Sequence, residues 1–373
     1  MSGLRVLITN NTLAVRAGTE LYVRDTAMEL LKRGHSPIAY STILGEVARE
    51  LQAAKIPVVD DLNDLAVVPD LIHGQQHMEL MTALLHFPRV PAIQFIHNSS
   101  SWYEKPVPFP RILRYVAVDH ACRDSLLEHA IPEERIRILL NFVDLARFQS
   151  RRKPLSATPQ RALLFSNYAS EETHLPAVRE ACERAGIELD VVGSHANTAT
   201  ANPEQILCEY DLVFAKARSA LEAMAVGAAV VLCDYKGSGP MVTPENFALL
   251  RPLNFGRRAL SGPLDAAILV EEIKRYDPVK ALRVSQTVRA SAGHEPVVDE
   301  LISLYEDVTL EFQQNGHGEK LKEDRAAAAY LRQLKIDFTA NAAAALRLRE
   351  RVERVPVVGR IGVKLARAFM REK

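Results

Sequence analysis

The sequence is poor in cysteine and tryptophan and has no excess of either charge. Its 373 residues include 4 cysteines and 1 tryptophan, and no two of the cysteines form a CxxC pair. We therefore expect reduced, structural thiols in a cytoplasmic protein, without a zinc site. Lys and Arg number 46, as do Asp and Glu. This zero net charge argues against a general nucleic-acid-binding protein, whose surface carries a basic excess.

Long hydrophobic runs are also missing. No apolar stretch approaches the roughly 18 residues that a membrane-spanning helix needs. The apolar run at residues 4–9 has neither a charged region before it nor a cleavage site after it, so we interpret it as a buried first strand rather than a signal peptide. The composition, 48% hydrophobic and 25% charged, is that of a globular protein. At about 150 residues per domain, the length predicts roughly two domains.

Short apolar runs rich in β-branched residues alternate with amphipathic stretches through most of the chain. In the first half we expect a helix at 20–33 and strands at 4–9, 37–40, 57–59, 70–72, 91–96, 115–118 and 136–140. The alternation resumes with helices at 171–185 and 217–226 and strands at 162–165, 189–192, 211–215 and 229–233. Continuous apolar strands separated by helices indicate parallel sheets that are covered on both faces.

The segment between these two halves, residues 151–160 (RRKPLSATPQ), is basic, contains two prolines and lacks periodicity, which is typical of a linker. We therefore predict an α/β protein with two Rossmann-like parallel-sheet domains, 1–150 and 161–296, that face each other across a cleft. Ligands of such sheets bind outside the carboxyl ends of the strands. Residues 297–373 form a helical, basic C-terminal extension in this interpretation.

The zero net charge hides an asymmetry. Residues 320–373 carry 14 Lys and Arg against 6 Asp and Glu, a net charge of +8, so the rest of the chain carries −8. Residues 355–373 alternate apolar and basic side chains, which would suit an anionic membrane at the inner face of the cell membrane. Alternatively, they pack on the body or on a partner subunit. The alanine-rich stretch 319–353 could form a coiled-coil homodimer, although its apolar spacing makes a poor heptad.

Candidate binding residues in the first half follow an expected strand. The loop at 10–20 (NNTLAVRAGTE) leads into a helix through Gly18 and Thr19. A glycine there lets the backbone approach a ligand, and a helix N-terminus supplies N–H groups for an anion or a sugar hydroxyl. A plain turn with an N-cap threonine explains the same residues. The nucleotide fingerprint GxGxxG is absent, which argues against a dehydrogenase.

Histidines close two of the expected strands. His97 follows the strand at 91–96, and a histidine there can donate a hydrogen bond or transfer a proton near pH 7. A structural histidine that caps a loop is the alternative. His73 and His77 stand four residues apart, a spacing that could suit a metal on a helix. No carboxylate accompanies them in a matching motif, so we expect no metal site.

The segment 216–227 (KARSALEAMAVG) opens a helix after a strand, and we expect Ser219 and Glu222 in the first turn of that helix, facing the cleft. A carboxylate there can accept hydrogen bonds from ribose hydroxyls, while Lys216 and Arg218 could neutralise phosphates. The alternative for Glu222 is a charge that stabilises the helix dipole.

Taken in order, several of these segments resemble the glycosyltransferases of family 4, which have the GT-B fold. The resemblance covers about residues 4–312. It is carried by AGTE (17–20), KRGH (32–35), LIHGQQH (71–77), FIHN (95–98), IPEERIRILLNFVDLARF (131–148) and RSALEAMAVGAAVVLCD (218–234). The resemblance implies transfer of a sugar from a nucleotide diphosphate sugar, usually with retention, without a required metal and without a cofactor besides the donor.

The resemblance also implies roles for individual residues. Glu222 matches the second glutamate of a paired motif that holds the nucleotide ribose, and His97 matches the histidine that contacts the donor sugar near the reaction centre. Gly18 matches the loop glycine near the diphosphate and the acceptor. Asn141 and Asp144 match a boundary motif that is largely structural. We expect the acceptor side to include Thr19, Glu20 and His73.

The donor site departs from the family pattern in two places. Phe214 stands where the first glutamate of the pair is usual. Residues 166–168 (SNY) and 171–172 (EE) occupy the region of the usual Arg and Lys. We therefore expect Lys216 and Arg218 to meet the diphosphate in their place.

Two functions are consistent with these observations. The first is a cytoplasmic hexosyltransferase that builds a cell-surface or secreted polysaccharide on a glycan or lipid-linked acceptor. The second is a non-catalytic sugar- or nucleotide-binding module on a decayed glycosyltransferase scaffold, which the missing Glu, Arg and Lys favour. A periplasmic two-lobed binding protein would need an export signal and would leave the Glu222 helix unexplained.

Overall fold

The computed structural model describes residues 3–315 and 319–353, and of residues 341–353 it describes the backbone alone. The described chain divides into two units. One unit contains the residues up to 106 and from 111 to 315, and it holds two β-sheets with their helices. The other unit contains residues 107–110 and the last helix.

The first sheet is parallel throughout, with its strands in the order β3-β2-β1-β4-β5-β6-β7. The strands are β1 (Arg5–Thr9), β2 (Ser36–Tyr40), β3 (Val58–Val59), β4 (Leu71–Gly74), β5 (Ala92–Ile96), β6 (Ile112–Ala117) and β7 (Ile136–Ile138). The connecting helices and turns are α1 (Gly18–Lys32), α2 (Glu46–Ala53), η1 (Leu62–Asp64), α3 (His77–His86), η2 (Trp102–Glu104), α4 (His120–Glu128) and η3 (Glu133–Arg135). Val6, Leu7 and Ile8 of β1 are fully buried although neighbouring strand residues point to opposite faces. Both faces of this sheet are therefore covered.

The second sheet has the strand order β12-β11-β10-β8-β9. Its strands are β8 (Arg161–Phe165), β9 (Glu188–Val192), β10 (Leu212–Ala215), β11 (Ala229–Asp234) and β12 (Gly237–Met241), of which only β12 runs antiparallel to its neighbour within the described residues. Helices and turns of this domain are α5 (Leu175–Ala185), α6 (Pro203–Ile206), η4 (Leu207–Glu209), α7 (Ala217–Val226), α8 (Pro244–Leu250), η5 (Arg251–Leu253), η6 (Arg257–Ala259), α9 (Ala266–Ile273) and α10 (Pro278–Ser291). The neighbours Val213 and Phe214 of β10 lie in two separate core clusters, as a sheet with both faces covered requires. The predicted architecture of two Rossmann-like α/β domains is confirmed.

Helix α5 begins later than the sequence pattern predicted, at Leu175 instead of Glu171. The Thr173 hydroxyl accepts the Ser170 N–H at 2.9 Å and donates to the Tyr168 carbonyl at 2.6 Å. These side-chain bonds hold a turn that competes with the helix. The first turn of the helix contains Pro176, and a missing N–H costs nothing at that position.

The predicted linker is fixed to the second domain. Arg151 donates to the carbonyls of Cys208 and Tyr210, each at 2.9 Å. The Asp211 carboxylate accepts the backbone N–H of Gln160 at 2.9 Å. These contacts tie the two ends of the segment 151–160 to the same part of the second domain.

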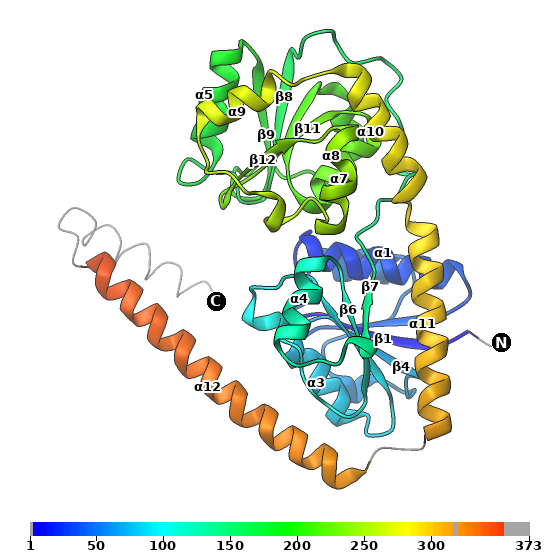
Figure 1. Ribbon diagram of the computed structural model, residues 1–373. Coiled ribbons are helices and arrows are strands. Elements are labelled where there is room, and N and C mark those ends of the chain that lie inside the picture. The colour runs from blue at the N-terminus through cyan, green and yellow to red at the C-terminus, as the bar shows by residue number, and fades with distance from the viewer. Residues whose placement is uncertain (1–2, 316–318, 354–373) are drawn as a thin grey trace. The chain divides into compact units, whose positions relative to one another are not determined.

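Helix α11 (His294–Asn315) follows the second domain in sequence but packs on the first (Figure 1). Asp299 accepts from Arg33, the C-cap residue of α1, at 3.0 Å, and Glu311 accepts from Arg114 of β6 at 2.5 Å. Its apolar face, which includes Val298, Leu301 and Val308, is buried. The sequence pattern predicted helical structure from residue 297 onwards but did not predict this return to the first domain.

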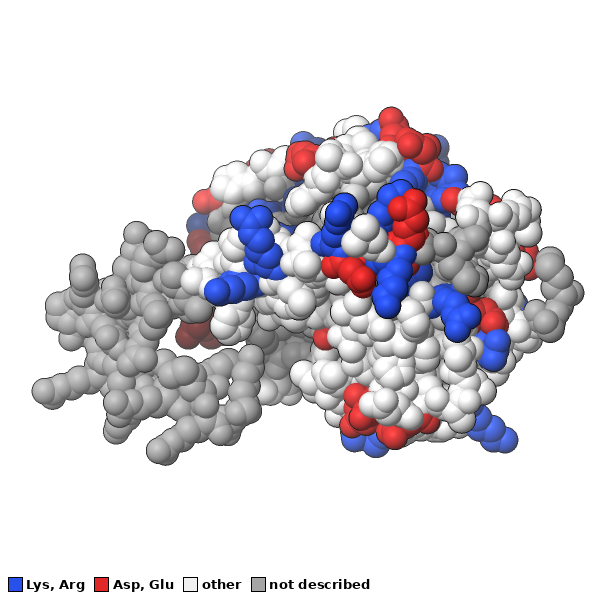
Figure 2. Space-filling view, turned by 90° about the horizontal axis from the view of Figure 1, so that it is seen from below, with Lys and Arg blue, Asp and Glu red and all other residues white. Residues whose placement is uncertain are grey.

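The second unit contains α12 (Lys320–Glu353), which agrees with the long alanine-rich helix expected from the sequence. Among the described residues, no helix is both long and apolar enough to cross a membrane. Residues 355–373, for which membrane contact was expected as one alternative, lie outside the described residues. On the face drawn in Figure 2, Lys and Arg side chains lie beside Asp and Glu side chains.

Candidate functional site

A cavity of about 300 Å³ is lined by both α/β domains. The first domain contributes the loop after β1 and the start of α1, including Arg16 and Gly18. The second domain contributes residues after β8 and β9, and from α7 it contributes Arg218, Ser219 and Glu222. Each of these segments follows the carboxyl end of a parallel strand, which is where α/β sheets bind ligands. The structure therefore brings together most of the residues expected to bind the donor.

A smaller cavity of about 180 Å³ shares Gly18 and Arg218 with the larger one. Its other lining residues come from α1, from the end of β5, from the segment after β7 and from the start of α7: Thr19, Tyr22, His97, Asn141, Phe142 and Ala217. Because two residues line both spaces, the cavities are neighbours.

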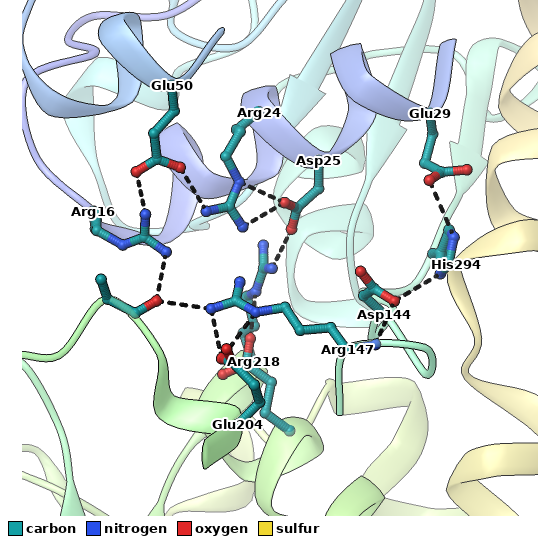
Figure 3. Close-up of polar contacts among 12 residues, drawn as sticks. Arg16, Arg24, Asp25, Glu29, Glu50, Asp144, Arg147, Glu204, Arg218 and His294 are labelled. Carbon is teal, nitrogen blue, oxygen red and sulfur yellow. Dashed lines mark hydrogen bonds and ion pairs between the residues drawn. The ribbon is translucent and has the colours of Figure 1, made fainter. Parts of the chain in front are cut away.

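Arg218 connects the two domains through two carboxylates, one largely buried and one buried. It forms ion pairs with Asp25 of α1 and with Glu222 of α7, the latter at 2.9 Å (Figure 3). Burial by itself would lower the pKa of Arg218, but the carboxylates of Asp25 and Glu222 outweigh that effect and raise it. Burial raises the pKa of Glu222 although Arg218 opposes the shift. Glu222 lies in the second turn of α7, one turn later than expected, because the helix starts at Ala217.

Two arginines that the sequence analysis did not single out line the same cavity. Arg16 and Arg147 both donate to the Ala201 carbonyl, at 3.0 and 2.9 Å (Figure 3). Arg16 also pairs with Glu50, and Arg147 pairs with Glu204 at 2.7 Å. Arg16 lies in the loop at 10–20, and Arg147 lies in the segment 131–148 that carried the family resemblance. Their position in or near a loop that follows a strand could have identified both as candidate binding residues.

Asp25 also belongs to a row of alternating charges. Arg24 lies between Asp25, at 2.6 Å, and Glu50, at 3.0 Å. Burial would raise the pKa of Asp25, but Arg218 and Arg24 outweigh that effect and lower it. Asp25 is therefore ionised at neutral pH, and the Arg218 guanidinium is engaged by carboxylates on both sides.

Lys216 is placed differently from its neighbour Arg218. It is the N-cap residue of α7 in an extended conformation and pairs with Asp234, which is fully buried at the end of β11. Its ammonium group lies 5.6 and 5.7 Å from the ring centres of Tyr168 and Tyr235. Lys216 is absent from the lining of the two cavities described above.

His97 is held at the end of β5 by three contacts. Its Nε2 bonds the Gln75 side chain, and its ring packs against the edge of Tyr22 with the ring centres 4.9 Å apart. Its backbone N–H donates to the Glu104 carboxylate, which also accepts the Asn98 N–H at 2.6 Å. Burial lowers the pKa of His97 to about 4. The imidazole is therefore neutral at pH 7, with one N–H and one lone pair.

The residues expected on the acceptor side separate in the structure. Thr19 lines the smaller cavity. Glu20 is 4% exposed and accepts the Thr19 hydroxyl at 3.0 Å, and burial raises the pKa of its carboxyl. His73 is fully buried, stacks on Phe95 with ring centres 4.2 Å apart, and lines neither cavity. Glu20 and His73 therefore lie behind the surface that a ligand would touch.

The departures from the family pattern leave neutral groups at the donor cavity. Ser166 and Asn167, which stand in the region of the usual basic residues, line the larger cavity. Phe214 is fully buried in a core cluster of the second domain and does not replace the missing carboxylate. Within the described residues, no group of three His, Cys, Asp or Glu is arranged to hold a metal ion.

Comparisons with known proteins agree with the fold. Residues 65–147 match the model of the family described as Glycosyltransferase Family 4. A glycosyltransferase from Rickettsia africae ESF-5 superposes with a TM-score of 0.60 at 16% identity, covering 83% of this chain and 99% of that one. Anabaena HepE in complex with UDP and glucose gives 0.60 at 14% identity, covering 81% and 99%. Sucrose-phosphate synthase from Thermosynechococcus elongatus gives 0.59 at 13% identity, covering 83% and 100%. No curated protein gives a significant match.

Proposed function

We propose that this chain moves a hexose-type sugar from a nucleotide diphosphate sugar to a glycan or lipid-linked acceptor. The proposal proceeds from the match of residues 65–147 to the family 4 glycosyltransferase model and from the GT-B fold that the chain shares with solved glycosyltransferases. The observation that carries the proposal is the larger cavity. Arg16, Arg147 and Arg218 come from three separate segments and line one space with Ser219 and Glu222. Guanidinium groups are the side chains best suited to pair with phosphate oxygens.

The donor nucleotide fits the charged groups of this cavity. In the described structure the arginines bond the Ala201 carbonyl and nearby carboxylates. The oxygens of a bound diphosphate would replace the carbonyl and some of these carboxylates as partners of the arginines. Glu222 bonds Arg218 through Oε1 only, so its second oxygen has no hydrogen bond within the described structure and is available for a ribose hydroxyl. Anabaena HepE, a structural neighbour, binds UDP and UDP-glucose, which supports a uridine nucleotide as the first probe.

The sugar of the donor would occupy the smaller cavity. Because Gly18 and Arg218 line both spaces, a diphosphate in the larger cavity leaves the sugar beside Thr19, Asn141 and neutral His97. The arginines would stabilise the charge that develops on the departing diphosphate, and the fixed position of the sugar would supply the rest of the rate enhancement. The family resemblance supports a retaining reaction that does not require a metal, in polysaccharide synthesis.

Calorimetry with UDP, GDP and ADP, followed by turnover of the matching sugar nucleotides with a panel of acceptors, tests the proposal. We expect Arg147→Gln to weaken nucleotide binding about tenfold, the loss of one charge-assisted hydrogen-bonding partner. Arg179→Gln is the matched control, because Arg179 pairs with Glu171 on the exposed side of α5 and lines neither cavity. Equal affinity in both variants contradicts the assignment of the donor site.

A non-catalytic binding module is the second candidate, and the burial of Phe214 is the observation that favours it. If the protein binds a nucleotide diphosphate sugar at the larger cavity but transfers the sugar to no acceptor and to no water, this second function holds. Binding together with turnover excludes it.

Two further parts of the proposal concern membrane contact, through residues 355–373, and dimer formation, through residues 319–353. The basic tail would hold the enzyme at the inner face of the cell membrane, and the long helix would pair two copies. Flotation with anionic liposomes compares the full chain with a chain ending at residue 318, which retains both sheets and α11. Equal flotation excludes the membrane contact, and equal mass by light scattering, allowing for the deletion, excludes the dimer.

A further inference from the structure

A chain of buried polar side chains leads from helix α11 to His97. The Tyr305 hydroxyl of α11 lies 2.5 Å from Nδ1 of His73 on β4. The other ring nitrogen of His73, Nε2, lies 2.9 Å from the amide nitrogen of Gln75. The amide oxygen of Gln75 bonds Nε2 of His97. Tyr305, His73 and Gln75 are all fully buried, so no water competes for these contacts.

In the structure, the NH₂ group of the Gln75 amide faces His73 and its oxygen faces His97, and this orientation requires one arrangement of protons. Its NH₂ group only donates, so Nε2 of His73 accepts and the proton of His73 is on Nδ1, which donates to Tyr305. Its oxygen only accepts, so Nε2 of His97 carries the proton. The second nitrogen of His97, Nδ1, then keeps its lone pair. Nδ1 makes no hydrogen bond within the described residues. It is also not one of the buried polar atoms without a partner, so it is accessible to a ligand.

Both histidines are neutral at pH 7. Burial lowers the pKa of His97 to about 4 and lowers that of His73 well below its usual value. Since a neutral imidazole has one donor and one acceptor, fixing the proton on Nε2 of His97 makes its free side an acceptor. That free side belongs to a residue lining the smaller cavity.

We propose that Gln75 is a positioning residue which, with His73 and Tyr305 behind it, holds His97 in the Nε2–H tautomer, so that Nδ1 accepts a hydrogen bond from a ligand hydroxyl in the smaller cavity. The identification of that hydroxyl with a sugar substrate rests on the proposed function, whereas the tautomer does not. The arrangement excludes His97 as a cationic partner for the diphosphate at neutral pH. It also gives α11, which joins the second domain to the first sheet, a part in setting the site.

Nitrogen NMR of ¹⁵N-histidine-labelled full-length protein, without any ligand, reads the tautomer directly. We expect a protonated signal for Nε2 of His97 and an unprotonated signal for Nδ1, with the reverse pattern for His73. Tyr305→Phe removes the acceptor for His73 Nδ1–H, so the amide of Gln75 is free to reverse and the Nδ1–H form of His97 should grow to a measurable fraction. Tyr210→Phe removes the same group from a tyrosine that bonds Asp190 in the second domain and should change nothing.

Gln75→Met provides the link to the substrate. It keeps the length of the side chain and removes both hydrogen-bonding groups, and its ellipticity and melting temperature show whether it folds. With UDP-glucose and its monodeoxy forms as probes, the wild type should lose about tenfold in kcat/KM for one deoxy position, and Gln75→Met should lose less than threefold at that position. A protonated Nδ1 in wild-type His97, or a tautomer unchanged in Tyr305→Phe, overturns the positioning role. A confirmed tautomer without binding or turnover of any sugar nucleotide overturns the proposed function instead.

Discussion

Replacing Asp25 by asparagine should strengthen nucleotide binding, although Asp25 lies outside the cavity lining. The Asp25 carboxylate is paired with Arg218, which does line the cavity, and with Arg24 at 2.6 Å. In the described structure this carboxylate bonds the Arg218 guanidinium, so a phosphate oxygen has to compete with it for that group. The asparagine side chain keeps the volume and loses the charge, so the change isolates this competition.

The size of the effect depends on the separation of the charges. For a phosphate on the far side of the Arg218 guanidinium we take a separation of about 8 Å from the Asp25 carboxylate. At an effective dielectric constant of about 20, removing one charge at that distance changes the interaction with one phosphate charge by about 2 kcal/mol. Screening by salt reduces this to about 1–2 kcal/mol, which is about 5- to 30-fold in Kd.

The same replacement should cost less stability than breaking a buried ion pair usually does. Arg218 keeps Glu222, and Arg24 keeps Glu50 at 3.0 Å, so neither cation is left alone. An uncompensated buried charge costs about 3–5 kcal/mol, and the variant should lose less than that.

Calorimetry with UDP at two salt concentrations measures the effect, with Asp124→Asn as the matched control. Asp124 also pairs across the domains, with Arg258, but both side chains are about half exposed and line neither cavity. The control changes the net charge equally and should leave Kd within about twofold. If Asp25→Asn binds UDP no more tightly than Asp124→Asn, or more weakly than the wild type, the idea that Asp25 competes with the ligand is wrong.

Three further changes have expected outcomes. Ala217 has φ = 50°, a left-handed conformation, so Ala217→Gly should raise the free energy of unfolding by about 1 kcal/mol in urea titrations; no gain would contradict a strained start of α7. A Cβ on Gly18 meets no atom within 4 Å, so Gly18→Ala should leave the melting temperature unchanged while weakening UDP binding by calorimetry, because Gly18 lines both cavities. Burial raises the pKa of Glu104 from 4.5 to about 7, so the native carboxyl binds a proton that the unfolded chain releases, and this stabilisation is lost as the pH rises from about 4.5 to 7. The stability of Glu104→Gln relative to the wild type should therefore increase over that range, by at most about 3 kcal/mol; a flat difference in urea midpoints across these pH values would contradict the shift.

The parts of the fold that were predictable are those with a local cause. β1 and β10 are continuous apolar runs, and such runs indicate strands that are covered on both faces. β12 has the sequence GSGPM, without apolar periodicity, and forms because it pairs antiparallel with β11. The packing of α11 on the first domain depends on partners such as Arg33 and Asp299, which are 266 residues apart. No local pattern contains that information.

The candidate site divides in the same way. Gly18, Ser219 and Glu222 were identified because they follow strands or open helices, and chain direction brings such positions to one edge of a sheet. The pairing of Arg218 with Asp25 spans 193 residues and requires both domains. Lys216 and Arg218 looked equivalent in the sequence. In the structure Lys216 is the N-cap residue of α7, has an extended backbone and pairs with Asp234, whereas Arg218 lies within the helix.

The charges around the larger cavity lead to a constraint on how any anion enters it. The arginines at 16, 24 and 218 are matched in the described structure by the carboxylates at 50, 25 and 222, joined in one row. A row of that kind has no net charge to attract a diphosphate from a distance, so its positive potential appears only when a carboxylate separates from an arginine. Asp25 is on one domain and Arg218 on the other, so this contact is one of those that join the two domains. Asp25→Asn removes this carboxylate without requiring any movement, so it should expose the positive charge of Arg218 to an anion and tighten the binding of that anion.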